Sequence, residues 1–211
     1  MRNIFSVILL FASLMSLAQH KDQKAIALLD ALSTKTKGSK SIKAEFSYSM
    51  VNEKAKINEE KTGSLLLSGN KYRMSAAGRI IYCDGKTIWT YIEKSNEVQI
   101  STLDEADDSM TPSKLLSSYN ENYKARIIKE KKQDANTELI ELIPNKQKNI
   151  TKAILGIDKA KTQVKSFKLF DKNGSVYAYT ITRYQTDIPV TIADFTFDAA
   201  KHPGVDIQDL R

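Results

Sequence analysis

Between residues 63 and 100 the sequence alternates short runs typical of β-strands with two-residue turn signals. The runs are rich in β-branched and aromatic residues and cover residues 65–67, 72–74, 80–83, 87–92 and 97–101. The turn signals are Gly69-Asn70, Ala77-Gly78, Asp84-Gly85 and Ser95-Asn96, each of which contains a residue that tolerates positive φ. Strands joined by so few residues pair with their sequence neighbours in antiparallel fashion. The stretch therefore predicts a locally connected, curved antiparallel sheet.

CDGKTIWTY at residues 83–91 and DFTF at residues 194–197 are two segments that resemble the LolA family, whose members are periplasmic carriers of outer-membrane lipoproteins. CDGKTIWTY at residues 83–91, which follows GSLLL and KYRM, is similar to the core of that family. DFTF at residues 194–197, followed by HPGVDIQDL at residues 202–210, is similar to its closing strand and C-terminal tail. The resemblance implies a mainly β (α+β) fold, a strongly curved antiparallel half-barrel of about 10–11 strands with helices covering the concave face.

The rest of the chain carries further strand and helix patterns. Alternation over residues 41–51 places Phe46, Tyr48 and Met50 on one face of a strand, and the polar segment 52–61 predicts a long hairpin connection. Apolar residues at helical spacing in residues 22–36 predict a helix with one buried stripe. Further strands are expected at residues 123–130, 137–143, 150–157, 163–170, 176–184 and 192–197.

The first 18 residues have the pattern of a secretory signal peptide, with Arg2, an apolar run at residues 4–17, and small residues at Ser16 and Ala18. The run of about 14 apolar residues is shorter than the roughly 20 that a spanning helix needs. We therefore expect cleavage after Ala18. Residues 19–211 would then form one monomeric domain in the periplasm, without stable membrane insertion.

Composition gives little support for catalysis or nucleic-acid binding. The net charge is +7, but the lysines are spread along the chain and alternate with acidic residues, which is typical of a solvated surface. The chain has two histidines and one cysteine, Cys83, and contains no GxSxG, HExxH or CxxC motif. The acidic cluster at residues 104–108 lacks the spacing of a calcium loop. The sequence therefore predicts no catalytic residues, no metal, no cofactor and no nucleic-acid partner.

What remains is the binding of acyl chains in an apolar cavity. Thr111-Pro112 predicts the start of a short helix, which in the resembled family is a lid segment and which contains Leu115 and Leu116. The predicted cavity residues are Phe46, Leu65, Leu67, Tyr72, Met74, Ile81, Trp89, Tyr91, Leu115 and Leu116. Ordinary core packing is the alternative for each of them.

The resemblance further implies acylated lipoproteins or lipids as cargo, an inner-membrane lipoprotein-releasing transporter and an outer-membrane acceptor. The family's lid-holding arginine corresponds to a position near Ser68-Gly69 in this sequence, so Arg73 or Lys71 would have to make the lid contact. A carrier or sensor for another lipid or hydrophobic ligand stays open as an alternative function.

Overall fold

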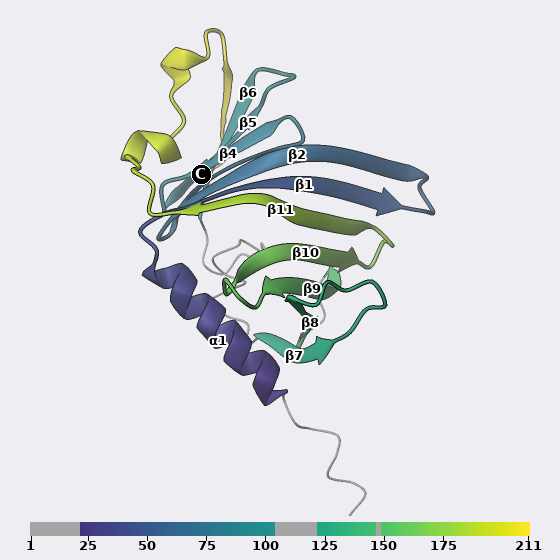
Figure 1. Cartoon of the computed structure of the whole chain (residues 1–211). Helices are drawn as coiled ribbons and strands as arrows, with labels where there is room; N and C mark the ends of the chain where they lie inside the picture. Colours follow the sequence, from purple (N-terminus) through teal and green to yellow (C-terminus); the bar gives the residue numbers. More distant parts are fainter. Residues whose placement is uncertain (1–21, 104–121, 147–148) are drawn as a thin grey trace, which may run out of the picture.

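The computed structural model describes residues 22–103, 122–146 and 149–211, and one curved sheet runs through them (Figure 1). The strands are β1 Ile42–Asn52, β2 Ile57–Ser68, β3 Lys71–Ala76, β4 Arg79–Cys83, β5 Thr87–Ile92, β6 Glu97–Thr102, β7 Tyr123–Ile128, β8 Thr137–Pro144, β9 Ile150–Asp158, β10 Gln163–Asp171, β11 Val176–Thr186 and β12 Asp206–Asp209. They form a 12-stranded sheet in the order β12-β6-β5-β4-β3-β2-β1-β11-β10-β9-β8-β7. The sheet is thus two meanders joined by the pairing of β1 with β11.

The predicted turns connect β2 to β6 as expected. Ala77 and Gly78 both adopt positive φ, 54° and 76°, in the two-residue turn between β3 and β4. At the next turn the Asp84 carboxylate accepts hydrogen bonds from the backbone N–H groups of Lys86 (2.9 Å) and Thr87 (2.8 Å). Gly85 beside it has φ 97°. These local bonds confirm the antiparallel meander that the turn signals predicted.

Helix α1, Gln23–Gly38, buries Ala25, Leu29 and Leu32 against the sheet, which confirms the predicted single stripe. Asp22 caps it by accepting from the Ala25 N–H at 3.2 Å. The other carboxylate oxygen of Asp22 accepts a hydrogen bond from the Ile127 N–H at 2.8 Å, and this bond attaches the helix to β7. α1 contacts β7 and β10. Within the described residues it is the sole α-helix, so the expectation of several helices over the concave face is not shown.

Three expectations about the sheet are wrong. The polar segment 52–61 is mostly strand, because β2 starts at Ile57 and pairs with β1 along its whole length. Residues 192–197 form no strand: Ile192–Phe195 is a 3-10 helix, η2, held by a capping box between Thr191 and Asp194. The chain closes the sheet later, through β12, which pairs with β6 in parallel rather than antiparallel fashion.

The predicted signal peptide, the acidic cluster and the lid residues Leu115 and Leu116 lie outside the described residues. No described helix has both the length and the apolar character needed to cross a membrane.

Candidate functional site

The candidate site lies on the face of the sheet that contacts α1, here called the helix-side face. Directly paired residues of neighbouring strands share a face, and the registers from β1 to β5 contain no shift. One row across the helix-side face is therefore Ala44, Leu65, Met74, Ile81 and Thr90, and the next is Ile42, Leu67, Tyr72, Cys83 and Ile88. On β1 the same face carries Phe46 and Tyr48. It continues across β11 to the residues of β10 that pack against α1.

Part of this face is aliphatic and incompletely covered. Its half-buried members, here called the aliphatic zone, are Leu65, Leu67, Met74, Ile81 and Ile88. Tyr72 and Cys83 between them are buried, and burial raises the pKa of the Cys83 thiol. The five side chains of the aliphatic zone are branched or flexible and, apart from the weakly accepting sulfur of Met74, have no hydrogen-bonding group. The zone can therefore contact an apolar ligand of irregular shape.

Next to the aliphatic zone, aromatic side chains gather on β1 and β11. The Phe46 ring lies over Gly63, where an added Cβ would come within 2.5 Å of its ring carbons. Tyr48 lies 5.1 Å from Tyr179 and 6.5 Å from Tyr177 between ring centroids. Burial raises the pKa of Tyr179 to about 12. Tyr48, Tyr177 and Tyr179 are here called the tyrosine cluster.

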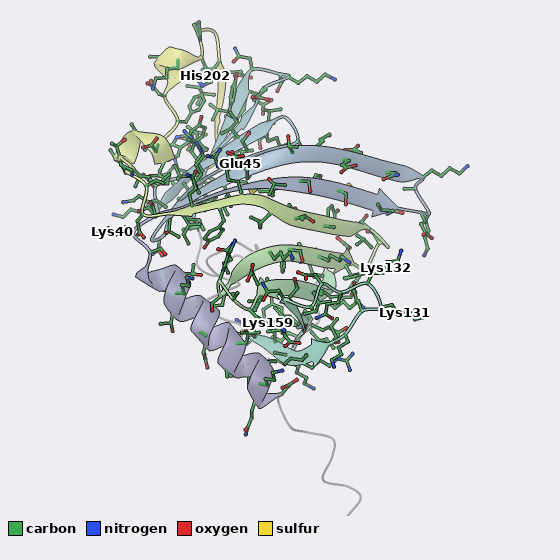
Figure 2. The ribbon with its side chains drawn as sticks, in the orientation of Figure 1. Lys40, Glu45, Lys131, Lys132, Lys159 and His202 are labelled. Atoms are coloured by element: carbon green, nitrogen blue, oxygen red, sulfur yellow. The ribbon has the colours of Figure 1, made fainter. Side chains whose placement is uncertain are left out.

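The register separates two of the predicted cavity residues from the others. Trp89 pairs with Tyr82 and Tyr91 pairs with Ile80, so both lie on the face opposite to Met74 and Ile81. There the sheet is covered by residues 192–202, here called the C-terminal segment, in which η2 contacts β3 and β4. The ring centroids of His202 and Tyr91 are 4.3 Å apart. His202 is labelled in Figure 2.

Arg73 lies on the same opposite face, because it pairs with Tyr82. The pKa of Asp194 in η2 is lowered mainly by the Thr191 N–H, with a smaller contribution from the positive charge of Arg73. Arg73 is thus placed beside the C-terminal segment, whereas the predicted lid residues fall outside the described part of the chain.

The opposite face of β7 to β10 is charged. The buried Glu141 carboxylate pairs with Arg126, and also with Lys152 at 3.6 Å. The Lys152 ammonium lies 4.5 Å from the centre of the Phe170 ring. A charged surface of this kind is poorly suited to contact an apolar ligand.

A polar pocket lies where α1, the β7–β8 loop and Lys159 meet. Lys24 and Glu138, which line it, form an ion pair at 3.3 Å, and both signs of charge occur around it. Among the described residues, no group of His, Cys, Asp or Glu side chains is arranged to hold a metal ion.

Sequence reasoning missed four residues of this surface, and one of them, Tyr48, was predicted only to share a strand face with Phe46 and Met50. Ile88 was predicted as part of a strand but not as a site residue, although its register partner is Cys83. Tyr177 and Tyr179 alternate along the YAYT sequence of β11, and this period-2 pattern was the available signal. Their meeting with Tyr48 depends on β1 pairing with β11, which are separated by more than a hundred residues in sequence.

Comparison with known proteins identifies the family. The family model described as outer membrane lipoprotein carrier protein LolA matches residues 37–198. The chain belongs to the LolA family. No curated protein sequence matches it significantly.

One solved structure shares the fold at low sequence identity, and two others show weaker similarity. An uncharacterized conserved protein from Thermus thermophilus is 14% identical with a TM-score of 0.58, over 89% of this chain and 99% of that one. A putative outer membrane lipoprotein-sorting protein domain from Vibrio parahaemolyticus is 13% identical with a TM-score of 0.46, over 82% and 97%. A LolA superfamily protein from Nitrosomonas europaea is 11% identical with a TM-score of 0.44, over 82% and 97%.

Proposed function

We propose that the chain is a periplasmic carrier that binds the acyl chains of lipoproteins on its helix-side face and carries them toward the outer membrane. The observation that supports this most directly is the aliphatic zone in a LolA-family chain, apolar and half-buried across four neighbouring strands. In the core beneath α1, by contrast, Leu29, Ile140 and Leu155 are buried.

Incomplete coverage suits a carrier energetically. A three-chain lipid anchor has about 45 methylenes worth about 0.8 kcal/mol each, roughly 36 kcal/mol if all were dried. Noncovalent binding reaches a ceiling near 18–21 kcal/mol, so full burial would exceed any useful affinity. The carrier has only to approach the affinity of a bilayer and then release its cargo. Partial contact on an open face meets that requirement.

In this proposal the working domain is residues 19–211, exported after removal of residues 1–18, and it acts as a monomer. It would receive cargo from an inner-membrane lipoprotein-releasing transporter and deliver it to an outer-membrane acceptor. These partners are inferred from the family, together with its description as a lipoprotein carrier.

Charge placed on the helix-side face tests the binding surface. Met74→Glu puts a carboxylate between Leu65 and Ile81, where an acyl chain would lie against it. We expect a folded variant that loses at least about tenfold in affinity for a fluorescent fatty-acyl probe. Ser47→Glu adds the same charge to the opposite face of β1 and should bind like the unmodified protein. Equal binding by Met74→Glu and Ser47→Glu would remove the aliphatic zone from the site.

Native mass spectrometry of protein purified from its own cell envelope identifies the cargo. A bound lipoprotein supports the carrier function, and a free lipid would favour the alternative of a carrier or sensor for another hydrophobic ligand. The intact mass from the same sample shows whether the chain begins at Gln19. A membrane-bound product that retains residues 1–18 would contradict the proposal.

A further inference from the structure

The helix-side face changes in character along the longest strands. β1, β2 and β11 extend beyond β3, whose last residue, Ala76, pairs with Gly63. The aliphatic zone lies on the near side of this Gly63–Ala76 pair. Beyond it, on the same face, comes the tyrosine cluster on β1 and β11, and the Lys61–Glu59 ion pair at 2.9 Å lies beside the cluster on β2, in the same rows.

The face thus changes along the strands from aliphatic side chains to tyrosines with charged side chains beside them, which matches the change from hydrocarbon to polar groups in an amphiphile. Phe46 marks the boundary, since its ring covers Gly63 and lies 5.6 Å from the ring of Tyr179 between centroids. Tyrosine suits a position between apolar and wet surroundings, because its ring contacts hydrocarbon while its hydroxyl forms hydrogen bonds.

The hydroxyls of the tyrosine cluster are available to a ligand. Within the described part of the chain, none of the three forms a hydrogen bond with another residue. No described side-chain oxygen is both fully buried and unpartnered, so each of these hydroxyls reaches accessible space. A tyrosine hydroxyl with the ordinary pKa near 10 is already protonated at neutral pH and can donate, and burial raises the pKa of Tyr179 further, to about 12.

We propose that the tyrosine cluster binds the ester carbonyls at the junction between the acyl chains and the glyceryl group of a diacylglyceryl ligand. The inference rests on the proposed function, because the chains attached to those carbonyls have to occupy the aliphatic zone. An ester carbonyl is a hydrogen-bond acceptor without a donor, which matches a tyrosine O–H as donor. The binding surface thereby selects ester-linked chains over hydrocarbon alone and fixes the direction in which they lie.

The test compares a pyrene-labelled diacylglycerol with the matching dialkyl ether lipid, which has the same chains but no carbonyl. Each hydrogen bond contributes a modest amount, so two carbonyls should favour the ester probe about tenfold for the unmodified protein. The Tyr48→Phe/Tyr177→Phe/Tyr179→Phe variant keeps all three rings and removes the hydroxyls. We expect it to bind the two probes within about twofold of each other, with its affinity for the ether lipid unchanged.

Tyr82→Phe is the matched control. It removes a half-buried hydroxyl from the opposite face, beside Phe197, and should retain the full preference for the ester probe. If the triple variant fails to fold, by circular dichroism, Tyr179→Phe alone should lower the preference about threefold.

The outcomes separate the two proposals. If the unmodified protein binds both probes equally, or the triple variant keeps the preference, the tyrosine cluster has no such role while acyl binding stands. If neither probe binds, the proposed function fails and this inference fails with it.

Discussion

The β7–β10 half of the sheet and the β2–β5 half present the same face to different surroundings. In the first, α1 covers the helix-side face so fully that Leu29, Ile140 and Leu155 are at most 1% exposed. In the second, the aliphatic zone stays half-buried on that face, and the C-terminal segment covers the opposite one, with Phe195 fully buried. Figure 1 shows α1 and the C-terminal segment at different ends of the curved sheet.

The comparison shows how one sheet can be stable and still keep an apolar surface accessible. Among the described residues, α1 covers the helix-side face of one half, and the C-terminal segment covers the opposite face of the other. Because these elements lie on opposite faces, the helix-side face of β2 to β5 does not have to be closed to stabilise its strands. The following predictions test this division.

Phe195→Ala should have the largest effect. It removes the one fully buried aromatic ring among the described residues, and we expect a loss of about 3–5 kcal/mol in the free energy of unfolding. Urea denaturation followed by circular dichroism measures it. Ile192→Ala, in the same 3-10 helix but 59% exposed, should change stability by no more than about 0.5 kcal/mol. Similar losses for the two variants would mean that the C-terminal segment is not a covering element.

Leu29→Ala should cost about 2–5 kcal/mol, because it opens a cavity in the core beneath α1. Met74→Ala truncates a half-buried residue of the aliphatic zone and should cost clearly less, since stabilisation scales with the apolar area removed from water. Binding of the acyl probe should show the reverse order. A larger loss of stability at Met74 than at Leu29 would contradict the distinction between the two halves.

Gly63→Ala should destabilise the protein by about 1–3 kcal/mol through overpacking. The new Cβ would approach the Phe46 ring at 2.5 Å and the Ser75 carbonyl oxygen at 2.6 Å, and backbone cannot easily move away. Gly38→Ala is the control, because a Cβ there meets nothing within 4 Å. The control should be neutral or slightly stabilising. The thermal midpoints of both variants measure the effect. Equal midpoints would mean that β1 and β2 are not packed tightly at Gly63.

Asp22→Ala should have the smallest effect, about 0.5–2 kcal/mol at pH 7, through loss of the helix cap and of the bond to Ile127. The Ile127 N–H is the main cause of the lowered pKa of Asp22. A lowered folded-state pKa means that the carboxylate stabilises the protein above its unfolded pKa near 3.8, and that this contribution is lost as pH falls through the folded value. Unfolding at pH 7 and pH 3 should show the difference between Asp22→Ala and the unmodified protein shrinking in acid. A constant difference would assign the effect to something other than the charge.

Much of the fold could be predicted because its signals are local. The turns at Ala77-Gly78 and Asp84-Gly85 depend on backbone preferences of two or three residues, and the α1 stripe depends on spacing within one helix. The strand expected at residues 192–197 failed for a local reason as well. The Asp194 carboxylate accepts a hydrogen bond from the Thr191 N–H, and this capping box overrides the β-preference of Ile192, Phe195 and Thr196.

The candidate site could be predicted only in part. Strand alternation correctly placed Phe46, Tyr48 and Met50 on one face of β1. It could not show on which face of the sheet Trp89 lies relative to Met74, because the relation of β3 to β5 passes through two turns. A change of one residue in either turn reverses the faces. Trp89 and Tyr91 were therefore grouped with residues from which the register separates them.

The sequence by itself determined the meander, the amphipathic helix and the family, since turn chemistry, periodicity and motif are properties of neighbouring residues. Only the tertiary structure decided which face each element covers. It places Tyr48 beside Tyr177 and Tyr179, and Phe195 against the face opposite to the aliphatic zone. It also adds β12 to the sheet next to β6. These contacts join residues far apart in the chain, and they follow from competition among apolar faces for burial, which no local pattern records.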